Sequence, residues 1–227
     1  MTPFGSLFIV ATPIGNLEDI TLRALRVLGE VSAIACEDTR QALKLLNKYR
    51  IHKELISFYQ PRERQKIPLI LSILKAGKDV ALISDSGTPG ISDPGFRLVR
   101  EAINEGIRVI PIPGPTAVAA ALCASGLATH RFLFLGFPPP KREAARKKLL
   151  ALRSEEGTLI FYVPARKICS FLMLAAEILG RRSVVIAREM TKIYEEFLRA
   201  GIPDIIELID KKKVKGEVVI LIEGAGK

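Results

Sequence analysis

Three segments of the chain combine glycine, proline and small hydroxyl residues in a way that suits ligand binding. They are residues 12–16, 85–95 and 113–117. Glycine lets a ligand approach the backbone and proline fixes the shape of a loop, so main-chain groups can hold a flat polar molecule at a low ordering cost. A nucleoside cofactor is such a molecule. One segment alone is typical of an ordinary turn, but three of them favour a binding site.

Each of these segments follows a short apolar run that is typical of a buried strand. The runs cover residues 7–11, 80–84 and 108–112. Further strands are predicted at residues 31–36 and 55–59, with one amphipathic helix between successive strands. Because single-helix crossovers require parallel pairing, the first half of the chain is predicted to form an open α/β sheet. Ligands bind such a sheet at the carboxyl ends of its strands.

Local signals predict where the helices of this half begin and end, and which faces they bury. The first helix is predicted to begin at a capping Asp19 and to end at a left-handed Gly29. Pro68 is expected to open the third helix, and Gly77 to end it. The apolar faces predicted for the first and fourth helices are Leu22, Leu25 and Leu28, and Phe96, Val99 and Ile103.

A proline cluster around Gly114 marks the expected domain boundary. Pro111, Pro113 and Pro115 lack backbone donors, so this segment cannot continue a sheet or a helix. We expect an N-terminal α/β domain of residues 1–115 and a C-terminal α/β domain of residues 116–227. The second domain is predicted to contain helices near residues 116–125, 165–179 and 203–209, and strands at residues 132–136, 158–163, 184–188 and 218–222.

The composition narrows the classes of protein that the chain can belong to. Its 227 residues are 48% hydrophobic and 26% charged, which is sufficient for two cores. The apolar runs are far shorter than the roughly 20 residues that span a bilayer, and no leader precedes residue 7, so we expect a cytoplasmic protein without membrane contact. Three isolated cysteines and two histidines predict neither disulfides nor a metal site.

The net charge of +10 is large for a chain of this size. Residues 1–116 carry 15 Lys and Arg against 12 Asp and Glu, and residues 117–227 carry 19 against 12. Such a surplus favours a polyanionic partner, because each neutralised phosphate releases a condensed counterion. Nucleic acid is therefore a candidate partner.

Common signatures of nucleotide-binding and hydrolytic enzymes are missing. No G-x-G-x-x-G follows the first strand, and neither G-x-x-x-x-G-K-[ST] nor G-x-S-x-G occurs. The sequence thus argues against dinucleotide enzymes, nucleoside triphosphatases and hydrolases.

Five motifs carry a resemblance to a known family. They are VATPIGNL at residues 10–17, CEDTR at 36–40, SDSGTP at 84–89 with SDPG at 92–95, PGPTA at 113–117 and AREMTK at 187–192. In order and spacing they resemble the bacterial small-subunit ribosomal RNA methyltransferase I family of the tetrapyrrole methylase superfamily. The resemblance extends from about residue 7 to residue 224, nearly the whole chain.

This resemblance implies a fold, a cofactor and a substrate. The fold would be two α/β domains of the tetrapyrrole methylase (class III methyltransferase) type, with S-adenosylmethionine in an interdomain cleft. The reaction would be methyl transfer to the ribose 2′-hydroxyl of a decoding-centre cytidine in 16S ribosomal RNA of the small ribosomal subunit. The resemblance also implies a homodimer.

The resemblance further implies a set of cofactor contacts. Many tetrapyrrole methylases carry Gly-Asp-Pro where this chain has Gly87, Thr88 and Pro89, so Asp85 is the candidate to replace that aspartate. The complete set of expected cofactor contacts is Pro13, Ile14, Gly15, Asp85, Thr88, Ile91, Thr116, Ala117, Tyr162, Ala187 and Glu217.

A ribose hydroxyl is a poor nucleophile, so a general base or a nearby cation would assist its attack. The candidates are Asp38, Asp85, Glu189 and Lys192, which lie in the motifs. Two other interpretations stay open. Asp38 also fits the acidic start of a helix, and Glu189 and Lys192 also fit a solvated charge pair.

Basic residues in two places could contact RNA phosphates. Lys141, Arg142, Lys147 and Lys148 belong to a basic stretch, and Arg23, Arg40 and Arg188 lie nearer the expected cleft. A solvated helix face is the alternative interpretation of the stretch.

Two competing functions remain at this point. One is a methylase of a tetrapyrrole or another small molecule, which would not need a charge of +10. The other is a non-catalytic RNA-binding module, which would not need three cofactor-type loops. Fold analogy alone does not decide between them.

Overall fold

The computed structural model describes residues 4–212 and 216–226. The chain divides into two compact units, Met1–Thr116 and Ala117–Lys227, and each is described here by itself. Both units are α/β layers, which confirms the predicted fold class. No described helix is long and apolar enough to cross a bilayer.

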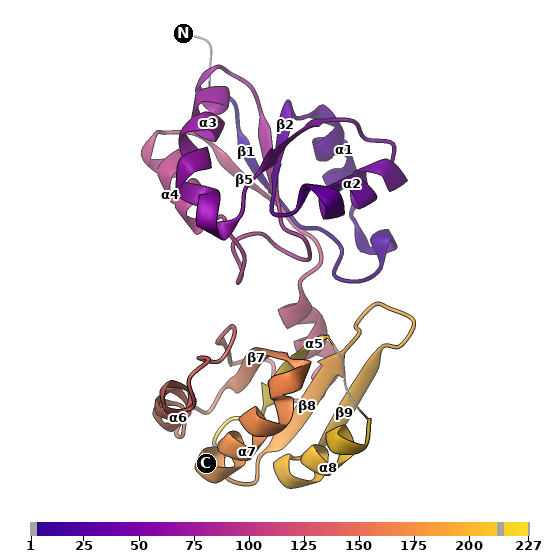
Figure 1. Cartoon of the computed structure of the whole chain (residues 1–227), viewed down its shortest axis with the longest axis vertical. Coiled ribbons are helices and arrows are strands. Elements are labelled where there is room, and N and C mark those ends of the chain that lie inside the picture. The colour runs from indigo at the N-terminus through magenta and orange to yellow at the C-terminus, as the bar shows by residue number, and fades with distance from the viewer. Residues whose placement is uncertain (1–3, 213–215, 227) are drawn as a thin grey trace. The chain divides into compact units, whose positions relative to one another are not determined.

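The first unit is a five-stranded parallel sheet with the strand order β3-β2-β4-β1-β5. Helices α1 and α2 cover one face of this sheet, and α3 and α4 cover the other (Figure 1). The elements are β1 (Leu7–Val10), α1 (Leu22–Glu30), β2 (Ala33–Cys36), α2 (Thr39–Lys48), β3 (Glu54–Ser57), α3 (Glu63–Lys75), β4 (Val80–Ile83), α4 (Phe96–Asn104) and β5 (Val109–Ile112).

The strands β2 and β4 are apolar throughout because both of their faces are buried. In β2, Ile34 and Cys36 pack with α1 and α2, whereas Ala33 and Ala35 pack with α3 and α4. The single helix between successive strands returns the chain to the end of the sheet at which each strand begins. All pairs of neighbouring strands are therefore parallel, which confirms the pairing predicted from the alternation.

The predicted start and end of the first helix are wrong. Asp19 ends a short 3-10 helix, and Thr21 caps α1 by accepting a hydrogen bond from the Ala24 amide. Gly29 lies inside α1 and is not left-handed. Of the predicted apolar face, Leu28 is buried and Leu25 packs against the core, but Leu22 is 86% exposed. The helix also buries Ala24 and Val27.

Two other helix predictions also need correction. Pro68 lies inside α3 and does not open it. The proline is exposed, so the carbonyl that it leaves without an intrahelical donor can bond to water. In α4, Leu98 and Ala102 form the buried face. Of the predicted face, Val99 packs against the core, but Phe96 and Ile103 are 67% and 60% exposed. The predicted ending at Gly77 is confirmed, since this glycine is left-handed directly after α3.

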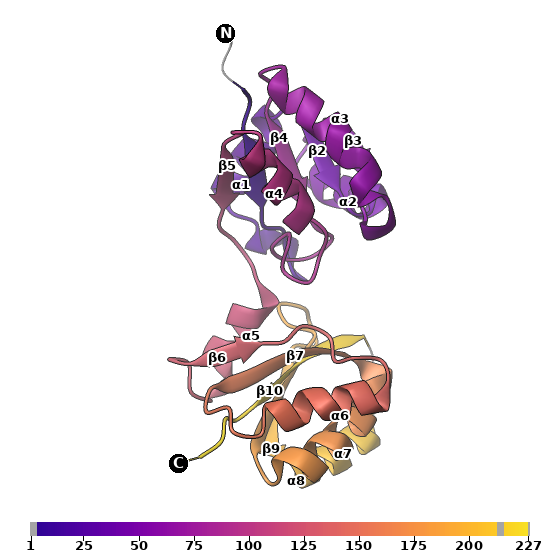
Figure 2. The same cartoon turned by 90° about the vertical axis from the view of Figure 1, so that its left-hand side faces the viewer.

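The second unit is a five-stranded mixed sheet with the order β6-β7-β10-β8-β9. Only β6 and β7 are parallel. Helices α6, α7 and α8 share one core cluster with one face of the sheet, and α5 lies on the opposite face against β10 and β8 (Figure 2). The elements are α5 (Ala117–Ser125), β6 (Phe132–Phe134), α6 (Arg142–Ala151), β7 (Thr158–Pro164), α7 (Ile168–Leu179), β8 (Ser183–Arg188), β9 (Glu196–Gly201), α8 (Ile202–Lys212) and β10 (Glu217–Ile222).

Strand β9 was not predicted from the sequence. It forms an antiparallel hairpin with β8 at the edge of the sheet, where Leu198 is buried and Arg199 is exposed. An edge strand of mixed polarity gives a weaker sequence signal than a strand buried on both faces.

We expect Gly29→Ala to stabilise the protein by about 0.5 to 1 kcal/mol, because Gly29 is inside α1 and a methyl group there meets no atom within 4 Å. The matched control is Gly106→Ala. This glycine also has open space, but its φ is 71°, so alanine should destabilise the protein by about 1 to 2 kcal/mol. Urea unfolding measures both changes. A destabilising Gly29→Ala would contradict this assignment.

Candidate functional site

The loops that follow β1 and β4 are joined directly by their backbones. The Thr12 amide donates to the Gly87 carbonyl at 2.8 Å, and the Gly87 amide donates to the Thr12 carbonyl at 3.0 Å. Thr12 Oγ1 also donates to the Ser84 carbonyl at 3.0 Å. Since β1 and β4 are neighbours in the sheet, these bonds extend the contact between them beyond the strands. The structure thus brings together two of the three ligand-type segments.

The third segment, after β5, is attached to the same loops. Thr88 Oγ1 donates to the Pro115 carbonyl at 3.2 Å. A methyl group on Gly114 would approach the Ala11 side chain to 3.0 Å, so a larger residue here would require Ala11 to shift by a few tenths of an ångström. All three predicted segments therefore meet at the carboxyl edge of the first sheet, as the sequence led us to expect.

The predicted cofactor residues of these loops differ in exposure. Pro13 is buried, Ile14 is half-buried and Gly15 is exposed. In the loop after β4, Thr88 is half-buried and Ile91 is 41% exposed. Apolar and main-chain surface is therefore available at this edge for a ligand.

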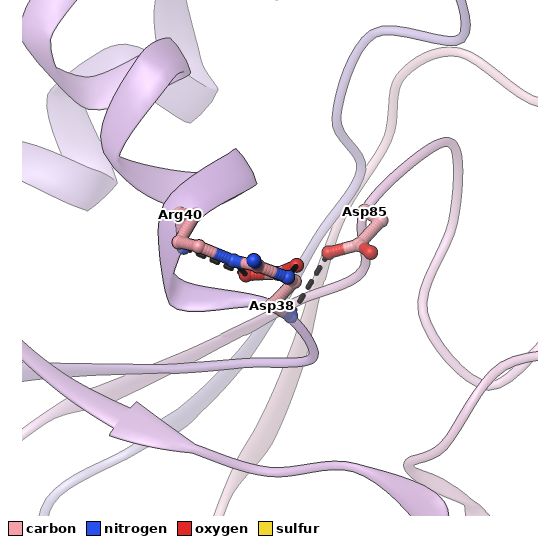
Figure 3. Close-up of polar contacts among 3 residues, drawn as sticks. All are labelled: Asp38, Arg40 and Asp85. Atoms are coloured by element: carbon pink, nitrogen blue, oxygen red, sulfur yellow. Dashed lines mark hydrogen bonds and ion pairs between the residues drawn. The ribbon is translucent and has the colours of Figure 1, made fainter.

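An acidic cluster lies at the ends of β2 and β4. The Asp38 amide donates to Asp85 Oδ1 at 3.0 Å, which joins the two loops (Figure 3). The Arg40 guanidinium binds Asp38 through two parallel hydrogen bonds, of 3.1 Å to Oδ1 and 2.7 Å to Oδ2. Asp38 also caps α2 through the Arg40 amide. The predicted residues Asp38, Arg40 and Asp85 therefore form one cluster.

The two aspartates of the cluster differ electrostatically. Hydrogen bonds from the Arg40 side chain lower the pKa of Asp38 to about 2, so this carboxylate stays charged and is a weak proton acceptor. Burial, together with the charge of Asp38, raises the pKa of Asp85, although the hydrogen bond from the Asp38 amide opposes this shift. Asp85 is therefore the better candidate for accepting a proton.

Glu37 is a member of the cluster that the sequence interpretation overlooked. Burial raises its pKa, and the charges of Asp93, Asp85 and Asp38 raise it further. The CEDTR motif contains Glu37 directly beside Asp38, so the motif was the available signal. Four carboxyl groups near one arginine create a negative potential that suits a cationic ligand.

Cys36 lies beneath this cluster at the end of β2. Burial, with the charges of Asp85 and Asp38, raises the pKa of its thiol to about 12. The thiol is neutral at physiological pH and is therefore not an activated nucleophile. Among the described residues, no group of three or more His, Cys, Asp or Glu has the arrangement of a metal site.

In the second unit, two predicted cofactor residues lie on the face of the sheet that α5 covers. Val219 in β10 pairs with Tyr162 in β7 on one side and with Ala187 in β8 on the other. The Tyr162 ring also makes edge contacts with Phe134 and Phe137. Glu217 lies in β10 opposite Pro164, and its side chain is outside the described part of the structure. Thr116 ends the first unit and Ala117 begins α5.

Three further predicted residues lie at the turn of the β8–β9 hairpin. Lys192 Nζ is 3.3 Å from Glu189 Oε1, and Arg188 Nε is 2.6 Å from Glu196 Oε2. Glu189 has a positive φ of 49°, which indicates a constrained turn. The structure thus pairs the two catalytic candidates Glu189 and Lys192 with each other within the second unit.

The predicted RNA-binding residues of the basic stretch lie on and just before α6. This helix covers the face of the second sheet opposite Tyr162 and Ala187. Lys141 and Lys147 are exposed, Arg142 is 3.5 Å from Glu177, and Lys148 donates to the Leu135 carbonyl at 2.8 Å. On α1 of the first unit, Arg23 is exposed.

Comparison with known proteins shows the family of the chain. Residues 6–206 match the model of the Tetrapyrrole (Corrin/Porphyrin) Methylases. The chain belongs to this family of methyltransferases. It is 46% identical to the ribosomal RNA small subunit methyltransferase I of Thermotoga maritima, over 97% of this chain and 99% of the relative. It is 47% identical to the enzyme of that name from Haemophilus influenzae, over 98% of this chain and 80% of the relative.

Solved structures with lower identity show the same fold. A cobalt precorrin-4 methyltransferase matches with a TM-score of 0.71 and 18% identity, over 96% of this chain and 94% of that chain. A uroporphyrin-III-C-methyltransferase from Thermus thermophilus matches with a TM-score of 0.68 and 19% identity, over 96% of this chain and 94% of that chain. The fold is therefore that of the tetrapyrrole methylases, as the motifs implied.

We expect Asp85→Asn to raise the melting temperature of the ligand-free protein at neutral pH. Burial and Asp38 raise the pKa of Asp85 in the folded state, so its charged form costs stability above that pKa. Asparagine keeps an acceptor for the Asp38 amide. The gain in melting temperature should shrink as the pH falls below the ordinary pKa of an aspartate, because Asp85 of the unsubstituted protein is then protonated in both the folded and the unfolded state. Thermal unfolding at several pH values measures this.

The matched control is Glu54→Gln, which removes an exposed carboxylate from β3. It should leave the melting temperature unchanged at every pH. A lower melting temperature of Asp85→Asn at neutral pH would contradict the proposed electrostatic cost.

Proposed function

We propose that the protein transfers the methyl group of S-adenosylmethionine to 16S ribosomal RNA of the small ribosomal subunit, at the ribose 2′-hydroxyl of a decoding-centre cytidine. One observation carries this proposal: relatives named ribosomal RNA small subunit methyltransferase I share 46 to 47% identity with the chain over 97 to 98% of its length. The match to the family model covers residues 6–206, a range that contains every motif of the candidate site.

The residues of the first unit fit the proposed cofactor. S-adenosylmethionine supplies an electrophilic methyl group on a positively charged sulfur. The carboxyl groups of Glu37, Asp38 and Asp85 provide the negative potential that such a charge needs. Ile14 and Ile91 offer apolar surface for a nucleobase, and Gly87 and Gly114 permit close approach of main-chain groups.

We assign cofactor binding in the first unit to Pro13, Ile14, Gly15, Asp85, Thr88 and Ile91. Their loops are joined to one another by the Thr12–Gly87 and Thr88–Pro115 hydrogen bonds, so the protein itself fixes their shape and little ordering is required on binding. Contacts from Thr116, Ala117, Tyr162, Ala187 and Glu217 stay predictions.

The reaction needs alignment of the attacking oxygen with the methyl group, and positioning can lower such a barrier by several kcal/mol, roughly 7 to 11 at best. Among the candidate bases, Asp85 is favoured because its raised pKa suits proton transfer, whereas Arg40 holds Asp38 in its charged form. Arg40 is also placed to attract an RNA phosphate, since its side chain is 85% exposed. Glu189 and Lys192 stay alternative candidates.

Methylation of a tetrapyrrole is the second candidate function, because solved structures of this fold include tetrapyrrole methyltransferases. Their identity of 18 to 19% shows only the fold. The net charge of +10 suits a long polyanion such as RNA, in which every nucleotide carries a phosphate. We further propose that the protein is cytoplasmic, where small subunits are present, and that it acts as a homodimer.

The proposal is tested by mapping ribose methylation in 16S RNA from cells with and without the gene. We expect one cytidine to lose its 2′-O-methyl group in the deletion strain. Purified protein and S-adenosylmethionine should restore it on small subunits from that strain, and more efficiently than on short oligonucleotides, because the target ribose must be presented in a defined shape.

The same experiment separates the competing functions. Asp85→Asn should restore methylation more slowly than the control Glu54→Gln. Saturating S-adenosylmethionine should raise the melting temperature, as linkage requires of a ligand that binds the folded state. Unchanged 16S RNA together with methylation of a tetrapyrrole would contradict the proposal. RNA binding without cofactor stabilisation would favour a non-catalytic module.

Replacing Lys141, Arg142 and Lys147 with Gln tests the proposed phosphate contacts of α6. If these side chains bind phosphates, the log-log dependence of RNA affinity on salt should flatten by about 0.7 to 0.9 for each phosphate that the protein no longer neutralises. Cofactor affinity should be unchanged. Lys148 is left intact because its ammonium group bonds to the Leu135 carbonyl. An unaltered salt dependence would make α6 an ordinary solvated helix and move the RNA surface to Arg23, Arg40 and Arg188.

A further inference from the structure

A groove of about 850 Å³ runs between α3 and α4 on the outer face of the first unit. The two helices lie side by side in both views (Figures 1 and 2). Helix α3 lines the groove with residues three or four positions apart, which lie on one face of the helix and include Arg64, Leu71 and Lys75. The contribution of α4 begins with Phe96 and Arg97. None of the motifs or site residues described above lies in this groove.

The basic charge of the groove is concentrated at one end. Lys75 is paired with Glu105 at 2.7 Å at the far end. Among the described residues, neither Arg64 nor Arg97 forms an ion pair. Arg64 is the second residue of α3 and Arg97 the second residue of α4, so their positive charges lie at the amino-terminal ends of both helices.

An exposed aromatic ring lines the same groove, at the residue that precedes Arg97 in α4. Phe96 is 67% exposed, which is unusual for a phenylalanine at the start of a helix that has its own buried face. The Arg100 guanidinium lies over this ring, 5.5 Å from its centroid. An accessible aromatic face with neighbouring arginines is the combination that single-stranded nucleic acids bind, through base stacking and phosphate contacts.

The basic end of the groove adjoins the candidate site. Both helices follow parallel strands and run back across the sheet, so their amino-terminal ends lie at the carboxyl edge of the strands. Phe96 comes directly after the loop that contains Asp85, Thr88 and Ile91. The Gly95 amide donates to Glu63 Oε1 at 3.3 Å, which ties the start of α3 to the end of this loop.

We propose that the α3–α4 groove binds a single-stranded segment of RNA that flanks the methylated nucleotide. A base would stack on Phe96, and phosphates would contact Arg64 and Arg97. This inference rests on the proposed function for its RNA substrate. It gives the first unit an RNA surface of its own, next to the site, whereas the basic residues of α6 lie in the second unit on the sheet face opposite Tyr162 and Ala187.

The test compares two adjacent pairs of substitutions. Phe96→Ala with Arg97→Gln removes the ring and one free cation from the groove. Leu43→Ala with Lys44→Gln is the matched control, because Leu43 is 46% exposed, Lys44 is exposed, and α2 covers the opposite face of the sheet. Affinity for small subunits from the deletion strain is measured over a range of salt concentrations.

The groove pair should weaken binding at least about fivefold, as expected for the loss of one stacked base. It should also flatten the log-log salt dependence by about 0.7, as expected for one phosphate contact on a single strand. With subunits at saturation, the rate of methylation should be retained, because neither residue touches the reacting atoms. The control pair should change neither affinity nor salt dependence.

Equal behaviour of the two pairs would overturn the inference. A change in the oligomeric state of the groove variant, with RNA affinity unchanged, would also overturn it and identify the groove as an interface between copies of the chain. Failure of the proposed function is distinguishable, since the unmodified protein would then not methylate small subunits at all. If it does methylate them and the two pairs behave alike, only the groove inference fails.

Discussion

The two hydrogen bonds between the backbones of Thr12 and Gly87 hold the loops after β1 and β4 in contact. Buried hydroxyl groups reinforce this junction, since Thr12 Oγ1 and Ser84 Oγ donate to carbonyls of the second loop. The loop after β5 joins through Thr88 and Pro115. Without these bonds, the backbone amides and carbonyls of the loops would need hydrogen bonds with water. The bonds therefore fix the backbone and leave side chains such as Asp85 and Ile91 available to a ligand.

The junction also determines the electrostatics of the site. It places Asp85 where its carboxylate accepts a hydrogen bond from the Asp38 amide. It also brings Glu37, Asp38 and Asp85 so close together that, besides burial, the charge of Asp38 raises the pKa values of Glu37 and Asp85. Arg40 forms its hydrogen bonds with Asp38 and lowers the pKa of that carboxyl group, whereas burial raises the pKa values of Glu37 and Asp85. A positively charged cofactor would relieve the repulsion among these carboxylates. Their unfavourable effect on stability is therefore linked to the proposed role of the cluster in cofactor binding.

The basic surplus of the chain is distributed over more than one surface. Lys141 and Lys147 project from the second unit, and Arg64 and Arg97 border a groove of the first unit that adjoins the candidate site. A large structured RNA can contact several such surfaces at once, and phosphate contacts fix its orientation while the site selects the reacting group. The proposed substrate therefore accounts for basic residues outside the Asp38–Asp85 cluster.

The sequence by itself determined the alternation of strands and helices, the parallel sheet of the first unit and the three loops at its carboxyl edge, because buried strands and Gly-Pro loops leave strong local patterns. It did not determine the buried face of α4, where an apolar Phe96 turned out to be exposed, or the edge strand β9. Nor did it show that the carboxyl groups of Asp38 and Asp85 have pKa values shifted in opposite directions. Only the tertiary structure binds Arg40 to Asp38 and partly desolvates Asp85, since pKa values depend on neighbours that are distant in the chain.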